Sequence, residues 1–380
     1  MPKSHYDYII IGNGLAGLQL ALALSSNSFF ISKQIALIDA SAKNTNDKTW
    51  SFWEKDTTEL SELAYKTWNK ANVITSKKKI HLNLSPYTYK SVRSLDFYTK
   101  IKTKLASKNN FKFIVEKVKD VVENNVVHVK TPENTYTATH VFDSRIPADF
   151  YKASNTYTTL IQHFKGWVIS TKKDSFNDDE FTMMDYRLKD GNQTTFMYVL
   201  PFSKTEALVE FTYFTKQLVD ETTYDTYIKQ YLKEYLNIFE YKIIDTETGQ
   251  IPMSTFPFYK YNTQKVTKIG TAGGWVKGSS GYSFKITQKK VDILIKNLKA
   301  NQTPSKGLFK SKYKFYDKVF LQVLKDENHK GEWIFQEYYR KNNSATMFRF
   351  LDEESNLLED IKVMLSLFSF SFIKAFFKTL

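Results

Sequence analysis

Hydrophobic and polar positions near the start of the chain follow the pattern of a strand, a turn, a helix and a second strand. Ile9-Ile10-Ile11 is a wholly apolar, β-branched run, which predicts a central parallel strand buried on both faces. A glycine turn follows at once, and the apolar stretch 15–24 predicts a helix after it. A second apolar run, 34–39, predicts another buried strand. The order of these elements predicts a βαβ unit.

The glycine turn has the spacing of a dinucleotide-binding loop. Gly12 permits a tight bend, Gly14 lets the backbone approach a pyrophosphate, and Gly17 lets the helix lie close to the strand. Asp39 ends the second strand and is suited to bind a ribose hydroxyl. The pattern predicts a Rossmann-type nucleotide site and does not distinguish FAD from NAD. The alternative is a tight turn that binds no ligand.

Two later segments are predicted to return to this nucleotide unit. One strand ends with Asp143 and Arg145, where many flavoproteins return to the nucleotide domain, although a salt bridge at a strand end explains the pair equally well. The segment 266–286 passes from a strand through glycines into a helix, and such glycines let backbone amides approach a flavin. The alternative is that they serve only turns. These glycines are Gly270, Gly273, Gly274 and Gly281.

The middle of the chain is β-rich. Runs between residues 158 and 214 predict successive strands of a second sheet, which could roof a pocket. Glu210 lies within an apolar run, where desolvation would raise the pKa of its carboxyl group and keep it protonated as an acid. The alternative is an outward-facing position, which strand alternation permits.

Three large aromatic residues stand close together after the nucleotide unit: Trp50, Phe52 and Trp53. Such side chains suit the wall of an apolar pocket, and their electron-rich faces can stabilise a cation. The same spacing is equally typical of a strand in the hydrophobic core.

The chain becomes helical beyond Pro304 and ends in a predicted helix over 357–380. Lysines among phenylalanines would allow this helix to lie in a membrane interface, while a helix that covers the core of the second domain has the same pattern. The longest apolar stretch there without charge, 363–373, is about half as long as a membrane span. We therefore expect peripheral membrane contact, no spanning helix, no signal peptide and a cytoplasmic location.

Composition narrows the chemistry further. The 380 residues include no cysteine, which excludes disulfides, Fe–S clusters and thiolate metal sites, and the six scattered histidines predict no metal site. The net charge of +14 is compatible with an anionic membrane surface, and no nucleic-acid motif is present. The expected organisation is an FAD-binding domain (1–80), a mixed connection (81–150), a β-rich substrate domain (151–262), the last part of the FAD-binding domain (263–300) and a helical C-terminal region (301–380).

Several segments in order give the chain a resemblance to lycopene β-cyclases of the bacterial type. The aromatic segment and the Leu-Val-Glu strand are the specific ones, whereas the glycine fingerprint occurs in any flavoprotein. The resemblance covers nearly the whole chain. Its segments are the fingerprint with Asp39, then 47–53, 93–98, 141–145, 184–185, 198–201, 208–210, 249–253, 281–284 and 350–352.

The resemblance implies an α/β fold like that of FAD-dependent hydroxylases and geranylgeranyl reductases. It also implies reduced FAD as cofactor, NAD(P)H as the source of electrons, lycopene as substrate, and Asp185 in the substrate pocket. In the family, the first acid of a Phe-Leu-Glu-Glu-Thr-like motif is taken as catalytic, and Glu210 occupies that place. Phe211 stands where the family has a second acid, which argues against a pair of adjacent carboxylates.

The resulting hypothesis is a cyclisation without net oxidation. Glu210 delivers a proton to lycopene, reduced flavin stabilises the cation electrostatically, and Glu210 or a nearby base takes a proton back. Two other functions share the glycine motifs. One is a redox flavoenzyme, either a hydroxylase or a prenyl reductase, and the other is a flavin-binding or carotenoid-binding protein without catalysis.

Overall fold

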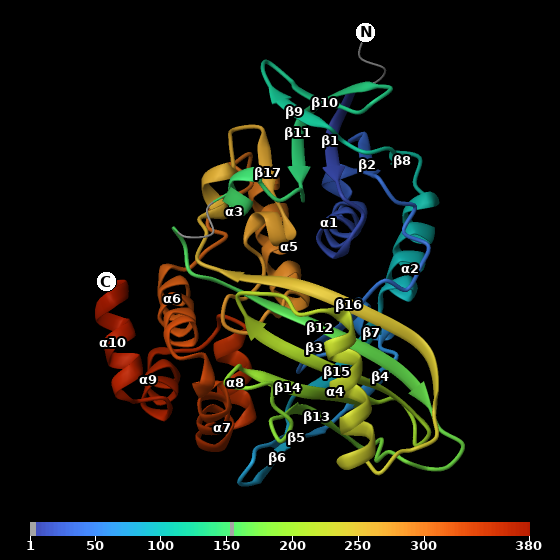
Figure 1. Cartoon of the computed structure of the whole chain (residues 1–380). Coiled ribbons are helices and arrows are strands. Elements are labelled where there is room, and N and C mark those ends of the chain that lie inside the picture. Colours follow the sequence, from blue (N-terminus) through green and yellow to red (C-terminus); the bar gives the residue numbers. More distant parts are fainter. Residues whose placement is uncertain (1–4, 153–155) are drawn as a thin grey trace.

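A computed structural model describes residues 5–152 and 156–380. Within these residues the strands form two seven-stranded sheets and a three-stranded sheet, and a group of helices follows at the C-terminal end (Figure 1). The first sheet lies at the top of Figure 1, the second below it, and the C-terminal helices at one side of the second. The small sheet consists of β3 (Thr49–Glu54), β7 (Thr88–Arg93) and β4 (Lys66–Trp68).

The first sheet contains the predicted βαβ unit, which the structure confirms. Its order is β8-β2-β1-β11-β10-β9, with β17 beside β11, and β1 pairs in parallel with both β2 and β11. Ile9 and Ile10 are fully buried, because both faces of this sheet are covered. The strands are β1 (His5–Ile11), β2 (Ile35–Asp39), β8 (Phe111–Val115), β9 (Asp120–Glu123), β10 (Val127–Lys130), β11 (Thr135–Asp143) and β17 (Val266–Lys268).

Helices α1 (Leu15–Ser25), α2 (Ser94–Ala106) and α5 (Phe284–Lys299) share one apolar cluster with one face of the first sheet. The opposite face packs in a second cluster with residues of β9 and β10. The shorter helical elements are η1 (Ser28–Phe30), η2 (Glu59–Leu63), α3 (Ala148–Lys152), η3 (Phe258–Tyr261), η4 (Gly270–Gly273) and η5 (Asn328–Lys330).

The second sheet has the order β16-β12-β15-β14-β13-β5-β6. β5 comes from the segment 1–80 assigned to the cofactor domain, yet it pairs with β13, so the chain crosses between the sheets earlier than expected. The strands are β5 (Lys70–Ile74), β6 (Lys79–Asn83), β12 (Thr159–Ser170), β13 (Glu180–Asp185), β14 (Thr195–Pro201), β15 (Glu206–Thr215) and β16 (Lys242–Ser254).

The two faces of the second sheet have different neighbours. Helix α4 (Glu221–Glu234) covers one face, where Val209 and Phe211 pack in one cluster with its side chains. Leu208 and Phe214 point the other way, into a cluster shared with the C-terminal helices. Side chains alternate along a strand, so Glu210 lies on the same face as Leu208.

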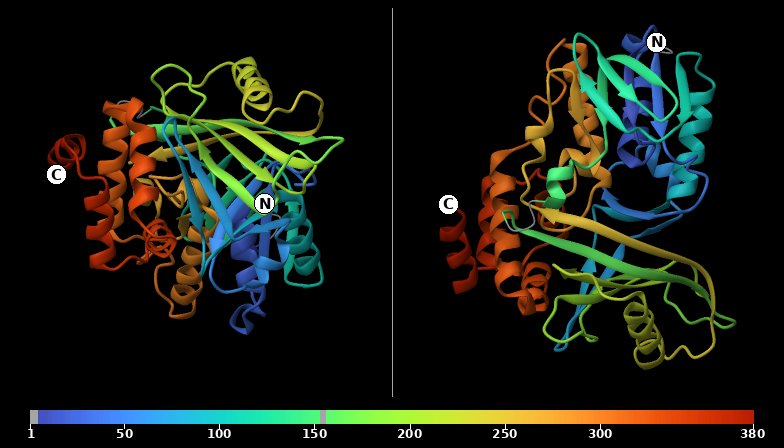
Figure 2. Two further views of the ribbon diagram at one scale, coloured as in Figure 1. Left: turned by 90° about the horizontal axis from the view of Figure 1, so that it is seen from below. Right: turned by 45° about the horizontal axis from the view of Figure 1, so that its top comes forward.

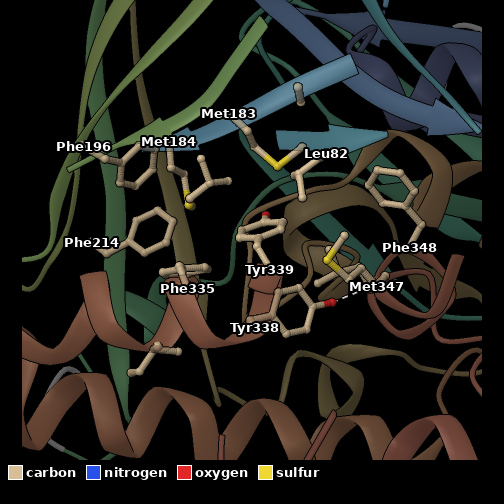
Figure 3. Packing of buried hydrophobic residues seen from close by; sticks show 14 of the residues in the cluster. Leu82, Met183, Met184, Phe196, Phe214, Phe335, Tyr338, Tyr339, Met347 and Phe348 are labelled. Atoms are coloured by element: carbon tan, nitrogen blue, oxygen red, sulfur yellow. Dashed lines mark hydrogen bonds between the residues drawn. The ribbon is translucent and has the colours of Figure 1, made fainter. Parts of the chain in front are cut away.

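The C-terminal helices lie beside the second sheet in both views of Figure 2, and their side chains share the apolar cluster of this second face. Met183, Met184 and Phe196 of the sheet face Phe335 and Tyr339 of α7 across the apolar core (Figure 3). These helices are α6 (Ser311–Asp326), α7 (Gly331–Lys341), α8 (Ser344–Leu351), α9 (Leu357–Ser366) and α10 (Phe370–Thr379).

The expected single helix over 357–380 is wrong, because two helices occupy this stretch. The backbone of Ser369 is extended, with φ −163° and ψ 163°, which interrupts helical geometry between α9 and α10. The interruption lets each helix bury a stripe of its own. Val363 of α9 and Ala375 of α10 are both buried, whereas Leu365, Phe368 and Phe370 between them remain exposed.

Candidate functional site

The glycine loop after β1 has the geometry that its spacing predicts. Gly12 has φ +98°, and a Cβ there would lie 2.0 Å from the Ser144 Oγ atom. A Cβ on Gly17 would lie 1.9 Å from the carbonyl oxygen of Gly12, so α1 can approach the loop only where residue 17 is glycine. Clashes with other atoms of the protein therefore exclude any residue larger than glycine at positions 12 and 17.

Gly14 differs from these two glycines, because a Cβ there would meet no atom within 4 Å. It precedes α1 and supplies no side-chain cap, so the first amides of that helix have no capping side chain. The Asp39 carboxylate accepts hydrogen bonds from the amides of Asn13 (2.6 Å) and Ser41 (2.8 Å), and the Asn13 Oδ1 atom is buried without a partner. Open space, helix amides and a carboxylate at this edge fit a dinucleotide.

Asp143 is fully engaged in ion pairs at the end of β11. Its carboxylate accepts two hydrogen bonds from the Arg145 guanidinium, each 2.9 Å, and one from the Lys268 Nζ atom at 2.8 Å. These cations hold the pKa of Asp143 below its usual value despite burial, which acts in the opposite direction. Asp143 thereby ties β11 to β17, and a contact of Asp143 or Arg145 with FAD stays a prediction.

The glycine segment after β17 packs between the two halves of the molecule. Gly270 and Gly274 have φ +61° and +68°, and a Cβ on Gly270 would lie 3.1 Å from that of Ala16 in α1. Gly281 has φ +73°, and its Cβ would lie 1.9 Å from the Gln162 Oε1 atom of β12. The loop before α5 thus connects the nucleotide unit to the second sheet.

Gly273 is also sterically required, because its Cβ would lie 2.5 Å from the carbonyl oxygen of Lys268. The Oε1 atom of Gln162 and the Oγ atom of Ser280 are buried without hydrogen-bond partners, and both residues line a cavity beside this loop. Unpartnered buried polar atoms are costly, which is consistent with a polar group of a cofactor reaching this place.

That cavity, about 460 Å³ in volume, lies among the second sheet, β3, the loop before α5 and the C-terminal helices. Its walls are mostly apolar and aromatic. Three tyrosine hydroxyls form a cluster in them: Tyr89 is 2.8 Å from both Tyr198 and Tyr282, and Tyr198 donates to the Ser51 Oγ atom at 2.9 Å. The cavity therefore combines apolar walls with electron-rich rings whose polar atoms are satisfied by one another.

Of the three predicted aromatic pocket residues, Trp50 lines this cavity, and Phe52 and Trp53 do not. Phe52 stacks on Phe284 at 4.3 Å between ring centroids, and Trp53 stacks on Phe348 at 4.6 Å. Both are buried, so they hold β3 against its neighbours in the way expected of a core strand.

Asp185 lies away from the cavity. It is fully buried on β13, where the Arg187 guanidinium and the Tyr231 hydroxyl donate to its carboxylate. Tyr231 belongs to α4, which covers the opposite face of the sheet. The predicted place of Asp185 in the substrate pocket is therefore not matched by the structure, because a register shift in β13 after Thr182 brings both Met183 and Met184 to the cavity and leaves Asp185 on the other side.

Glu210 lies in the cavity wall and is only 6% exposed. Burial, together with the neighbouring carboxyl group of Glu247, raises the pKa of Glu210 well above its ordinary value, and a hydrogen bond from the Thr212 hydroxyl (2.6 Å) opposes this in part. Phe211 points away, with its ring 4.6 Å from that of Tyr227 on α4. A second acid at position 211 would therefore not have reached Glu210.

Glu247 is a cavity residue that the sequence analysis missed. It lies on β16 and is half-buried, and Gly166 of β12 separates it from Glu210. Burial raises the pKa of Glu247 to about 7. The local sequence indicates only a turn leading into a strand at this point, and no spacing in it connects Glu247 to Glu210.

Solved structures of flavoproteins have the same fold as this chain. A geranylgeranyl bacteriochlorophyll reductase-like protein from Thermoplasma acidophilum is 10% identical, with a TM-score of 0.64 over 99% of this chain and 100% of the other. A flavin-dependent brominase is 15% identical, with a TM-score of 0.61 over 95% and 93%. A halogenase variant in complex with FAD is 11% identical, with a TM-score of 0.59 over 95% and 82%.

These likenesses show the α/β fold of FAD-dependent oxidoreductases with a helical C-terminal part, as the sequence predicts. No protein of curated function is significantly similar to the chain in sequence. The family model described as lycopene cyclase protein matches residues 7–376, which is nearly the whole chain. The chain therefore belongs to the lycopene cyclase protein family.

Proposed function

We propose that this protein converts the linear ends of lycopene into β-rings, giving γ-carotene and then β-carotene, without net oxidation. The observation that carries this proposal is Glu210: in a member of the lycopene cyclase family, a carboxyl group with a strongly raised pKa lies in the wall of an apolar, aromatic cavity. Such a group is a proton donor at neutral pH.

The reaction requires one proton to enter and one to leave at each end of the polyene. Protonation at C2 creates a cation at C1, the electrons of the C5=C6 bond close the ring, and loss of the proton from C6 restores a double bond. Glu210 is the proposed donor of the first proton. The apolar walls exclude water, which would capture the cation, and the electron-rich ring of Trp50 is part of these walls.

The chain's own residues fit FAD as the cofactor, because open space in front of Gly14 and the Asp39 carboxylate suit its dinucleotide part. When bound, reduced flavin supplies electron density near the place where positive charge develops. NAD(P)H is the proposed source of its electrons. The glycines of the loop before α5 allow the backbone of this chain to approach the flavin closely.

The proposed site of membrane contact is the C-terminal apolar face, a group of exposed residues on α9, on α10 and directly after each of these helices. Met364, Phe368 and Phe376 of this face also line the cavity, so a substrate dissolved in lipid could enter from it. Lys362 and Lys374 are exposed beside it, which suits anionic lipid. The face consists of Leu357, Leu358, Ile361, Met364, Leu365, Phe368, Phe370, Ile373, Phe376, Phe377 and Leu380.

No helix in the described parts of the chain is long and apolar enough to span a bilayer. The proposal is therefore a peripheral protein of the cytoplasm that rests on the membrane surface. Vesicle flotation tests this with Leu358→Glu and Phe370→Glu, because each side chain is 78% exposed and should not affect folding. Both variants should lose vesicle binding, and Phe239→Glu, an exposed residue outside the face, should retain it. Unchanged binding of the first two would disprove this membrane site.

The cyclisation is tested with lycopene in liposomes and chemically reduced FAD under anaerobic conditions, with products identified by chromatography. Glu210→Gln should retain FAD and lose ring formation, whereas Glu206→Gln, on the same strand but outside the cavity, should remain active. Full activity of Glu210→Gln would refute the assignment. Stoichiometric consumption of NAD(P)H would indicate a redox flavoenzyme, and bound carotenoid without new rings would indicate a binding protein.

A further inference from the structure

We propose that Glu210 and Glu247 form a carboxyl dyad that holds a single proton, in which Glu210 is the acid and Glu247 is the base that accepts the proton from C6. This inference rests on the proposed cyclisation and assigns the base that the reaction needs. It also explains how the chain manages without a second acid next to Glu210.

The two carboxyl groups come together because a glycine lies between their strands. In β12, Gly166 is paired with Glu210 of β15 on one side and with Glu247 of β16 on the other. Strands on either side of a central strand are about 10 Å apart, which two glutamate side chains can bridge if nothing stands between them. A Cβ on Gly166 would lie 3.3 Å from the Glu210 Cβ atom and 3.5 Å from the Glu247 Cγ atom.

The space above Gly166 is therefore filled by the two glutamate side chains. A Cβ there would also lie 2.8 Å from the Leu208 Cδ1 atom, so even alanine is excluded without a shift. β12 is hydrogen-bonded to strands on both sides and cannot move aside without breaking one of the two ladders. Gly166 lies within a strand, so no turn requires glycine there. Its lack of a side chain instead leaves room for the two carboxyl groups to come together.

The surroundings of the dyad differ between its two members. Glu247 raises the pKa of Glu210 both by its charge and as a hydrogen-bond partner, and two carboxyl groups can share a hydrogen bond only if one of them carries a proton. The hydroxyl and the amide of Thr49, together with the charge of Lys48, favour ionised Glu247, and Asp245 opposes them. On the Glu210 side the neighbours are the Thr212 hydroxyl and the phenols of Tyr198 and Tyr282, which are neutral at pH 7.

This asymmetry places the proton on Glu210 and the negative charge on Glu247. The pKa of Glu247 is about 7, whereas that of Glu210 lies well above its ordinary range, so the singly protonated pair exists at and above neutral pH. In the resting site two neighbouring carboxylates would repel each other, which keeps Glu210 protonated; during the reaction the cation formed on the substrate balances the second negative charge.

The dyad supplies the proton that the reaction consumes and recovers the proton that it releases. The O–H bond of Glu210 breaks and a C–H bond forms at C2, which leaves Glu210 as a carboxylate and C1 as a cation. The C1–C6 bond forms from the electrons of C5=C6, which moves the positive charge from C1 to C5. The C–H bond at C6 then breaks, its electrons restore the C5=C6 bond, and the proton goes to Glu247. Transfer of that proton across the dyad to Glu210 restores the starting state, with nothing oxidised or reduced.

The kinetic test compares the rate of ring formation against pH in the wild type, Glu247→Gln and the control Glu206→Gln. In the wild type and the control, the rate should fall as the pH drops below about 7, because Glu247 becomes protonated. Glu247→Gln should lose about a hundredfold or more in rate, as is typical when a general base is removed, and should lose this acid limb. A wild-type rate and pH profile in Glu247→Gln would overturn the dyad.

A second measurement does not depend on activity. Infrared or ¹³C spectroscopy with labelled glutamate can follow the titration of Glu210 in the FAD-bound protein without lycopene. Glu247→Gln removes the neighbouring charge and should lower the pH at which Glu210 ionises, and an unchanged titration would overturn the dyad. If the wild type forms no rings, the proposed function fails, while this titration still decides whether the two carboxyl groups share a proton.

Discussion

Gly14→Ala should separate cofactor binding from folding more cleanly than any other change in the glycine loop. A Cβ at Gly14 would meet no protein atom within 4 Å, and its backbone, with φ −81° and ψ −164°, is one that alanine adopts easily. The methyl group would project into the space in front of α1, where we propose that the pyrophosphate of FAD binds. Gly14→Ala should therefore fold with nearly unchanged stability but bind FAD more weakly.

The expected magnitudes follow from this geometry. Alanine is a poorer residue than glycine before the first helical turn, at a cost of about 1 kcal/mol or less, and it lowers the entropy of the unfolded chain by about 0.4–1 kcal/mol. These effects nearly cancel, so the free energy of unfolding should change by less than about 1 kcal/mol. Loss of one hydrogen bond to a charged phosphate costs about 1.5–3 kcal/mol, which corresponds to roughly 10- to 150-fold weaker FAD binding.

Two assays measure these quantities on one preparation. Urea denaturation of the apoprotein gives the free energy of unfolding, and titration of flavin fluorescence gives the Kd for FAD. The matched control is Gly17→Ala, whose Cβ would lie 1.9 Å from the Gly12 carbonyl oxygen, so it should be destabilised by about 1–3 kcal/mol or more. If Gly14→Ala binds FAD as tightly as the wild type, the proposed position of the pyrophosphate is wrong. If Gly14→Ala is as unstable as Gly17→Ala, the space around residue 14 is not open.

Three further predictions concern stability and pH. Asp143→Asn should lower the free energy of unfolding by about 3–5 kcal/mol in urea at pH 7, because it leaves two cations without their buried partner. The lowered pKa of Asp143 means that this stabilisation exists above its ordinary value of 3.8 and is lost on acidification below it, so the variant should show a weaker acid dependence. Phe52→Ala should cost about 3–5 kcal/mol by the same measurement, whereas Tyr151→Ala at an exposed site should change it by less than about 0.5 kcal/mol. The raised pKa of Glu247 should make the wild type lose stability as pH rises from 4.5 through about 7, and Glu247→Gln should flatten that slope in unfolding curves recorded at several pH values.

The nucleotide unit was predictable because local sequence alone determines its main features. Three β-branched residues in β1 require burial on both faces, and the glycine spacing corresponds to one tight bend, one open position and one close approach. The alternation along β15 also decided that Glu210 and Phe211 lie on opposite faces. Only the tertiary structure could say which of these faces borders the cavity.

The second carboxyl group could not be predicted in this way. Glu247 meets Glu210 because β12 is inserted between their strands and carries Gly166 at the shared register position, and strand order is not encoded in any local pattern. Asp185, predicted for the pocket, is bound to α4 on the other face because of an irregularity in the pairing of β13, which no local pattern indicates. Hydrophobic period and turn chemistry act between near neighbours in the chain and determine the elements. The chemistry of the cavity depends on contacts between distant residues, which exist only when the sheet and the helices have assembled.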